Sequence, residues 1–225
     1  MADRPIIFSA PMVRALLEGR KTQTRRVLKL AGRSPEFIGP RGCEADPTCW
    51  GWETPDGYFI TVEGDEKDHA PEWRNGWRDW AGAYAPGNRL WVRESITRQE
   101  TDQGVGYQTY AADGSKVWPL TQWFHRRNAV PSIHMPRWAS RLTLTVTDVR
   151  VQRLQDISEE DAVAEGVDAI SMEDVPRQAA MSRRSDFGAL WNSLHGAGAW
   201  DANPWIIALT FTVQRGNIDS GGVTA

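Results

Sequence analysis

Hydrophobic positions along the chain change their period several times, and each change predicts a different element. Apolar and polar residues alternate in RLTLTVTDVRVQRL, so residues 141–154 are expected to form one long strand. Two shorter apolar runs, 6–8 and 205–213, predict further strands, and so does PGNRLWVRES after Pro86. Strands are therefore expected near both ends and in the middle of the chain.

Two segments with a helical period separate these strands. After the first strand, Ser9 is suited to an N-cap, Pro11 to the first helical turn and Gly19 to the helix end, with apolar residues between them at spacings of three and four. A second segment, from about 186 to 194, carries one apolar stripe made of Phe187, Leu190, Trp191 and Leu194.

The segment DISEEDAVAEGV is the clearest helix signal of the sequence. Ser158 is a candidate N-cap, Asp161 stands at the capping-box position, and Gly166 provides the stop. Glu165 then falls in the last turn, where its negative charge meets the negative end of the helix dipole. This placement is slightly unfavourable for the helix itself.

Two further segments have a different composition. Residues 31–86 are rich in Pro, Gly, Trp and acids, with a small hairpin expected around YFITV, and residues 98–131 are rich in loops with one expected strand pair. We interpret both as insertions in a single domain spanning 1–215, and we expect 216–225 to be a disordered tail. Because strands and helices do not alternate regularly, the pattern favours an α+β fold, a small, mostly antiparallel or mixed β-barrel with peripheral helices.

The composition and net charge of the chain limit the kinds of function that it can have. The chain has 225 residues, 40% of them hydrophobic and 12 of them tryptophan, which is ample for a sizeable core. Its net charge of −3 provides no general attraction to nucleic acid, so such binding would need a local basic patch. Residues 14–29 are a candidate, because six Lys or Arg and one Glu give them a local charge of +5, whereas 156–174 carry eight acids and no Lys or Arg.

Targeting and cofactor signals are weak. The apolar run near the N-terminus is too short for a signal peptide, and no run of 18 apolar residues occurs. We therefore expect a cytoplasmic protein without a membrane segment. Cys43 and Cys49 are expected to be reduced, although they could close a small loop or join His69 in a metal site that lacks C-x-x-C spacing. No phosphate-binding loop, dinucleotide fingerprint or Ser-His-Asp order is visible, so we expect no cofactor and no metal.

The octet GRKTQTRR, residues 19–26, contains side chains that could catalyse a reaction. If one more helical or turn-like step follows the helix, Lys21 and Thr24 point the same way, and a lysine partly withdrawn from water could take the proton of the hydroxyl. Arg26 could hold a developing oxyanion or a phosphate, and Glu165 could carry protons or orient Lys21. The alternative is ordinary: cations follow a helix C-terminus, and Glu165 is a surface acid.

A resemblance to a known family favours the catalytic interpretation of these residues over the ordinary one. The segments IIFSAPMVRALLEGRKTQTRRV, PGNRLWVRES, HMPRWASRLTLTVTDVRVQRLQDISEEDAVAEGV and FGALWNSLHGAGAWDANPWIIALTFTV cover about two thirds of the chain. Together with the Lys-x-x-Thr-x-Arg spacing, they resemble the ASCH domain superfamily, relatives of the PUA fold, and look like its bacteriophage-encoded branch. The resemblance implies a small β-barrel that binds RNA or nucleoside-like ligands, here in the cytoplasm of a host cell.

Within that superfamily the chain resembles the amidohydrolases that deacetylate N4-acetylcytidine. The resemblance implies that Lys21, Thr24 and Glu165 are catalytic, with Arg26 as the basic residue two beyond the threonine. Those enzymes are about half as long, so the insertions must reshape the pocket mouth and could change the substrate to a polynucleotide or another acyl-modified base. Other members bind RNA or are ribonucleases, which leaves as the alternative either a non-catalytic module that binds RNA or single-stranded nucleic acid, or a ribonuclease.

Other residues are candidates for substrate contact. Arg25 belongs to the basic octet. Glu94 could face the pocket as a second acid or form a rim ion pair with Arg93. Trp138, near Arg137 and Arg141, is the best tryptophan for stacking on a base, although most tryptophans are expected to pack in the core or the insertions. The oligomeric state does not follow from the sequence.

Overall fold

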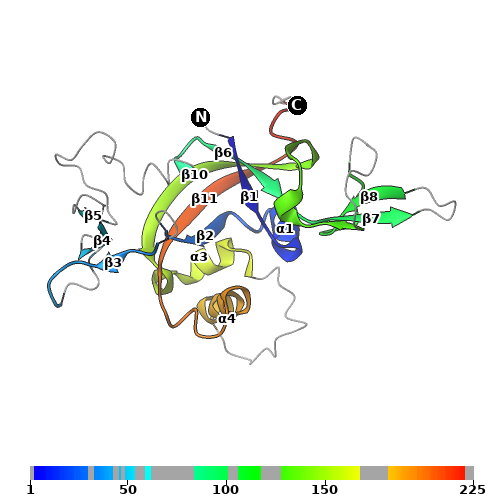
Figure 1. Cartoon of the computed structure of the whole chain (residues 1–225). Helices are drawn as coiled ribbons and strands as arrows, with labels where there is room; N and C mark the ends of the chain where they lie inside the picture. Colours follow the sequence, from blue (N-terminus) through cyan, green and yellow to red (C-terminus); the bar gives the residue numbers. More distant parts are fainter. Residues whose placement is uncertain are drawn as a thin grey trace.

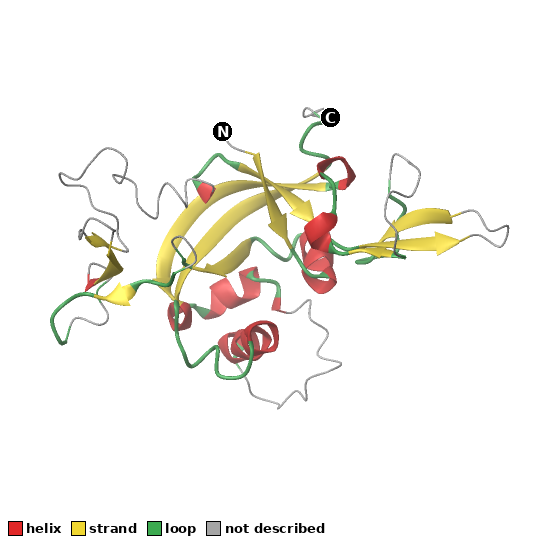
Figure 2. Ribbon diagram, in the orientation of Figure 1, coloured by secondary structure: helices red, strands yellow, loops and turns green. Residues whose placement is uncertain are grey.

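The protein is described by a computed structural model (Figures 1 and 2). The structure describes residues 3–29, 33–42, 46, 49–53, 59–61, 84–100, 106–117, 128–167 and 182–220. It is an α+β fold in which most of the core belongs to one sheet. Within the described residues, no helix combines the length and the apolar character needed to cross a membrane.

The large sheet has five strands in the order β1-β6-β10-β11-β2. Their bounds are β1 Asp3–Ile7, β6 Arg89–Arg93, β10 Leu142–Arg153, β11 Trp205–Arg215 and β2 Gln23–Val27. β1 pairs with β6 in parallel, whereas all other pairs are antiparallel. The strands expected at 6–8, after Pro86, at 141–154 and at 205–213 are thus confirmed, and β10 and β11 form the long curved centre of the sheet (Figure 1).

The sheet does not close into the expected barrel. Among the described residues, β1 and β2 are the two edges, and no strand pairing joins them. A side chain bridges these edges, because Arg26 on β2 donates a hydrogen bond of 3.0 Å to the carbonyl oxygen of Ile7 on β1. The strand pattern predicted the strands correctly, but the predicted closure into a barrel is wrong, because closure depends on pairing between residues far apart in the sequence.

The helices are α1 Ala10–Leu17, α3 Glu159–Ala164 and α4 Arg183–His195. All three match the expected segments, and Ser9, Ser158 and Ser182 are the N-caps. In Figure 1, α3 and α4 lie on the same side of the large sheet. Side chains from both helices and from β11 form a buried apolar cluster there, which includes Ala162, Phe187, Trp191, Ile206 and Ala208. This cluster fixes both helices against the end of the sheet that carries β2.

Two small sheets lie at opposite ends of the molecule in Figure 1. One contains β3 Glu36–Phe37, β4 Trp50–Glu53 and β5 Phe59–Thr61, and the other contains β7 Ile96–Glu100, β8 Gly106–Tyr110 and β9 Ala129–Val130. The strand pairs expected around YFITV and YQTYAADG are thus present. Short 3-10 helices are η3 Ser132–His134, η4 Arg137–Ala139 and η5 Leu154–Asp156.

The expected disordered tail is wrong for residues 216–220. The side-chain amide of Asn217 donates to the carbonyl oxygens of Arg137, Trp138 and Ser140, at 2.7, 3.1 and 2.9 Å, and Ile218 is buried. The polar, glycine-rich composition predicted disorder, but the side chain of Asn217 anchors this segment to the backbone around η4. Residues 221–225 of the expected tail lie outside the described residues.

The expectation of reduced cysteines is also wrong at Cys49, which is disulfide-bonded. The expectation of thiols relied on the cellular compartment expected for the protein and not on the geometry of the loop. Cys43 and His69, the other two members of the suggested metal site, lie outside the described residues. No group of metal-binding side chains occurs in the part of the chain that the structure describes.

Candidate active site

Lys21 lies in the short connection between α1 and β2. Gly19 adopts a φ of +73°, a left-handed conformation that lets the chain leave the helix. The backbone N–H of Lys21 then donates to the carbonyl of Ala15 at 3.1 Å, and that of Thr22 donates to the carbonyl of Ala164 at 2.9 Å. The connection is thus fixed to α1 on one side and to α3 on the other, and the side chain of Lys21 is only 2% exposed.

Glu165 meets Lys21 at the end of α3. The Lys21 ammonium donates 2.6 Å to Glu165 Oε2 and 2.8 Å to the Glu165 backbone oxygen, and both side chains are buried. Gly166 makes this approach possible: it has a φ of +82°, and a Cβ on it would lie 3.2 Å from Lys21 Cβ and 3.1 Å from Ala15 Cβ. The glycine that ends the helix therefore also lets the helix end touch the lysine.

Arg25 binds the opposite oxygen of the same carboxylate. Its guanidinium donates 3.0 Å to Glu165 Oε1 and 2.7 Å to Asp161 Oδ2, and its side chain is buried. Gln23 and Arg150 complete the surroundings of Asp161, at 2.9 Å and 3.1 Å. Glu165 is thus held between two cations, which fixes the orientation of its carboxylate.

Thr24 and Arg26 lie on β2, which pairs with β11 in the register Thr24 to Leu209 and Arg26 to Ile207. Because side chains alternate along a strand, these two residues share a face. Arg26 donates 2.7 Å to the hydroxyl oxygen of Thr24. Of the helical or turn-like step considered after Gly19, the helical form does not occur: a short connection leads into β2, and Lys21 and Thr24 line the same cavity.

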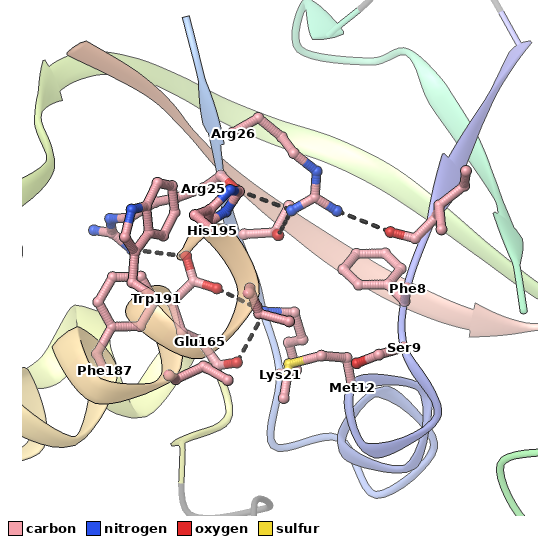
Figure 3. Close-up of a pocket in the computed structure, with 14 residues that line it drawn as sticks. Phe8, Ser9, Met12, Lys21, Arg25, Arg26, Glu165, Phe187, Trp191 and His195 are labelled. Atoms are coloured by element: carbon pink, nitrogen blue, oxygen red, sulfur yellow. Dashed lines mark hydrogen bonds and ion pairs between the residues drawn. The ribbon is translucent and has the colours of Figure 1, made fainter. Parts of the chain in front are cut away.

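These groups line one cavity of about 310 Å³ (Figure 3). Its polar floor is formed by Lys21, Thr24, Arg25, Arg26 and Glu165, and α4 contributes an apolar wall. The full lining is Ile7, Phe8, Ser9, Met12, Lys21, Thr24, Arg25, Arg26, Glu165, Phe187, Leu190, Trp191, Leu194 and His195. A concave, largely apolar site with a few convergent polar groups is the usual form of a small-molecule site.

Burial governs the electrostatics of the floor. Removal from water lowers the pKa of Lys21, although the nearby Glu165 carboxylate opposes this shift. Burial raises the pKa of Asp161, but the hydrogen bond from Gln23 and the charges of Arg25 and Arg150 outweigh it and leave that pKa below its usual value. Asp161 is thus a lasting negative charge, whereas Lys21 is an amine that gives up its proton more easily than a free lysine.

The structure brings five of the seven sequence-predicted residues together: Lys21, Thr24, Glu165, Arg25 and Arg26 all line the cavity. It does not bring Glu94 or Trp138 there. Glu94 is buried and accepts two hydrogen bonds from Arg141, at 2.8 and 2.9 Å. Burial raises the pKa of Glu94, and Arg141 acts against this rise. Glu94 therefore neither lines the cavity nor pairs with Arg93, the two alternatives that the sequence left open.

Trp138 lies on η4, away from the cavity, and is 37% exposed. The two arginines that suggested nucleic-acid contact there bind acids of this chain. Arg137 pairs with Asp3 and Asp219 at 2.7 and 2.6 Å, and Arg141 pairs with Glu94. The stacking role expected for Trp138 therefore has no cationic support from these two neighbours.

Three features of the candidate site were not predicted from the sequence. Asp161 was assigned to a capping box, but its carboxylate binds Arg25, while its backbone N–H donates to Ser158 at 3.1 Å. His195 is not among the predicted site residues, yet it lines the cavity beside Trp191, with ring centroids 4.2 Å apart. Phe8 ended an apolar run and lies under two cations, 5.6 Å from Lys21 Nζ and 5.2 Å from Arg26. The spacing of His195 to Trp191, i to i+4 on one helix, was the only available signal.

The basic segment 14–29 does not form one exposed surface. Lys21 and Arg25 are buried, and Arg20 pairs with Glu18 within the same segment. Arg14 donates to the carbonyl of Ala112 at 2.8 Å. Most of these cations thus bind other groups of the chain, which weakens the interpretation of this segment as a groove for a nucleic-acid backbone.

Comparisons add no relatives to this picture: no protein-family model, curated protein or solved structure matches the chain.

Proposed function

We propose that the chain contains an ASCH-type domain and is an amidohydrolase that removes an acyl group from N4-acetylcytidine or a related acylated base. The observation that carries the proposal is the contact of 2.6 Å between two buried groups, Lys21 Nζ and Glu165 Oε2, in a cavity that the Thr24 hydroxyl also lines. An amine with a lowered pKa, a carboxylate and a hydroxyl in one sheltered pocket are the parts of an activated nucleophile.

In the proposed reaction, Glu165 first accepts a proton from Lys21 along their short hydrogen bond, which leaves a neutral amine. This amine takes the proton of Thr24 as Thr24 Oγ1 attacks the acyl carbonyl carbon. The bond between that carbon and the exocyclic nitrogen of the base then breaks, and the nitrogen takes the proton from Lys21. Water next attacks the acyl ester on Thr24 and gives a proton to Lys21, which returns it to Thr24 as the carboxylic acid leaves.

Arg26 has a defined part in this scheme. Its guanidinium donates to Thr24 Oγ1, so negative charge that develops on this oxygen is stabilised by a permanent cation. The same hydrogen bond occupies a lone pair of the oxygen and leaves the hydroxyl proton of Thr24 free to point elsewhere. The apolar wall of α4, with Phe187 and Trp191, would contact the base and keep water away from the reacting atoms.

The test is release of the acyl group from N4-acetylcytidine and from its monophosphate, followed by mass spectrometry of the base. Thr24→Val removes only the hydroxyl and should abolish turnover, whereas Thr24→Ser should restore part of it. Arg20→Gln, which removes a cation of the same octet outside the cavity, is the matched control and should behave like the unaltered protein. Absence of turnover on both substrates, or turnover that survives Thr24→Val, would refute the proposal.

A further inference from the structure

Arg26 differs from the other two cations of the cavity. Lys21 and Arg25 each bind Glu165, and Arg25 also binds Asp161. Arg26 forms no ion pair with any acid in the described part of the chain. Three of its five N–H groups donate, to Thr24 Oγ1, to its own neighbour's carbonyl and to the Ile7 carbonyl, so two remain without an acceptor there.

Two other polar groups of the lining lack hydrogen-bond partners among the described residues. Ser9 is the N-cap of α1, yet its hydroxyl makes no capping hydrogen bond. The His195 ring contacts Trp191, and burial and the positive charge of Arg26 lower the pKa of the imidazole, so its neutral form offers one N–H at neutral pH. Arg26, Ser9 and His195 thus present donors to the same cavity.

The charge of the cavity is unbalanced. Three cations and one acid line it, an excess of +2, which falls to +1 when Asp161 is counted as the second partner of Arg25. A neutral nucleoside would leave this excess uncompensated. A phosphate monoester carries a charge of about −1.5 to −2 at neutral pH and three strong acceptor oxygens, so it compensates the positive excess and can accept hydrogen bonds from the open donors.

We propose that the cavity binds a phosphorylated substrate, a nucleoside monophosphate whose phosphate is held by Arg26, Ser9 and His195. This inference rests on the proposed function for the base and adds the chemical class of the substrate. A single nucleotide is favoured over a polymer because the cavity, of about 310 Å³, is at the lower end of the range for small-molecule sites. A diester in a polymer also carries only one negative charge.

Binding of reaction products tests this inference without requiring turnover. Isothermal titration with cytidine, cytidine monophosphate and a short oligocytidylate, on the full chain, should show the monophosphate binding at least about tenfold more tightly than cytidine. Its advantage should shrink as salt is raised. Arg26→Gln should remove the advantage, and Ser9→Ala should reduce it without removing any hydrogen bond of the fold. Arg20→Gln is again the matched control.

Equal affinity for cytidine and its monophosphate, no binding of either, tighter binding of the oligonucleotide, or an advantage that persists in Arg26→Gln and Ser9→Ala would overturn the inference. The two proposals fail separately. Deacylation without a phosphate preference would leave the amidohydrolase standing and remove the phosphate site. Arg26-dependent binding of the monophosphate without deacylation would do the reverse.

Discussion

Lys21 donates to Glu165 twice, once to the carboxylate at 2.6 Å and once to the backbone oxygen at 2.8 Å, across 144 residues of sequence. The backbone contact places the end of α3 against the lysine, so the carboxylate contact does not depend on a flexible side chain alone. The pair therefore belongs both to the proposed chemistry and to the packing of α3 against the connection between α1 and β2.

Gly166→Ala should separate this pair. The substitution places a Cβ at a φ of +82° and within 3.2 Å of Lys21 Cβ, so α3 must shift away from Lys21. We expect a loss of about 1–3 kcal/mol in the free energy of unfolding, measured by urea denaturation, together with a loss of deacylation. Gly198→Ala is the control, because Gly198 has a similar φ of +79° but nothing within 4 Å. Equal losses for both variants would show that backbone strain alone is responsible.

The rate of deacylation should depend on the protonation of Lys21. Because burial lowers the pKa of Lys21 below 10.5, the neutral amine that the mechanism needs appears at a lower pH than in a free lysine. Transfer of the proton to Glu165 within the pair does not change with pH, but loss of the Lys21 proton to water adds neutral amine as pH rises, so the rate should rise with a midpoint below 10.5 in a pH profile of kcat/KM. Lys21→Met should lower kcat/KM by about 10²–10⁴-fold and remove this rise. A rise that Lys21→Met leaves in place would assign the titration to another group.

The lowered pKa of Lys21 should also make the free energy of unfolding depend on pH. Between the lowered pKa of Lys21 and 10.5, the folded protein binds fewer protons at Lys21 than the unfolded chain does. The contribution of this residue to the free energy of unfolding should therefore rise with pH across that window and level off above 10.5. Urea denaturation at several pH values, with Lys21→Met as reference, measures this difference. A contribution that falls with pH would mean that the folded state favours the charged amine.

Glu94→Gln should affect stability and leave the chemistry intact. Arg141 would lose a carboxylate that accepts two hydrogen bonds in a buried position, at a cost of about 1.5–3 kcal/mol. Asp113→Asn, which alters the more exposed second partner of Arg141, should cost less. Thermal or urea unfolding and a deacylation assay on the same preparations distinguish the two effects. Lost turnover at unchanged stability would return Glu94 to the active site.

Asn217→Ala should destabilise the protein although it lies in a segment with the composition of a tail. The substitution removes three hydrogen bonds to carbonyl oxygens of the η4 region, of which that of Arg137 keeps the Ser140 backbone N–H as a donor, and we expect a loss of about 1–3 kcal/mol. Asp219→Ala removes only an exposed ion pair with Arg137 and should change stability much less. Unfolding curves that coincide for Asn217→Ala and the unaltered protein would contradict the described anchoring.

The sequence allowed prediction of the elements that rest on local rules. The alternating pattern of 141–154 and the Ser158 cap with Gly166 as the stop correspond to β10 and α3, because period and capping are properties of neighbouring residues. Strand closure, the partner of Glu94 and the second role of Asp161 depend on contacts between distant segments, which no spacing encodes. The residues alone left the pairing of Lys21 with Glu165 as one of two interpretations, which the family resemblance then favoured, whereas His195 was not predicted.

The central claim is that Lys21 and Glu165 act on Thr24 as one unit. Deacylation rates of the unaltered protein, Lys21→Met, Glu165→Gln and the double variant test it in a single thermodynamic cycle. The account predicts that either single substitution lowers kcat/KM severely and that the double variant is scarcely slower than the slower single one. Losses that simply multiply in the double variant, or a Glu165→Gln variant with full activity, would contradict it.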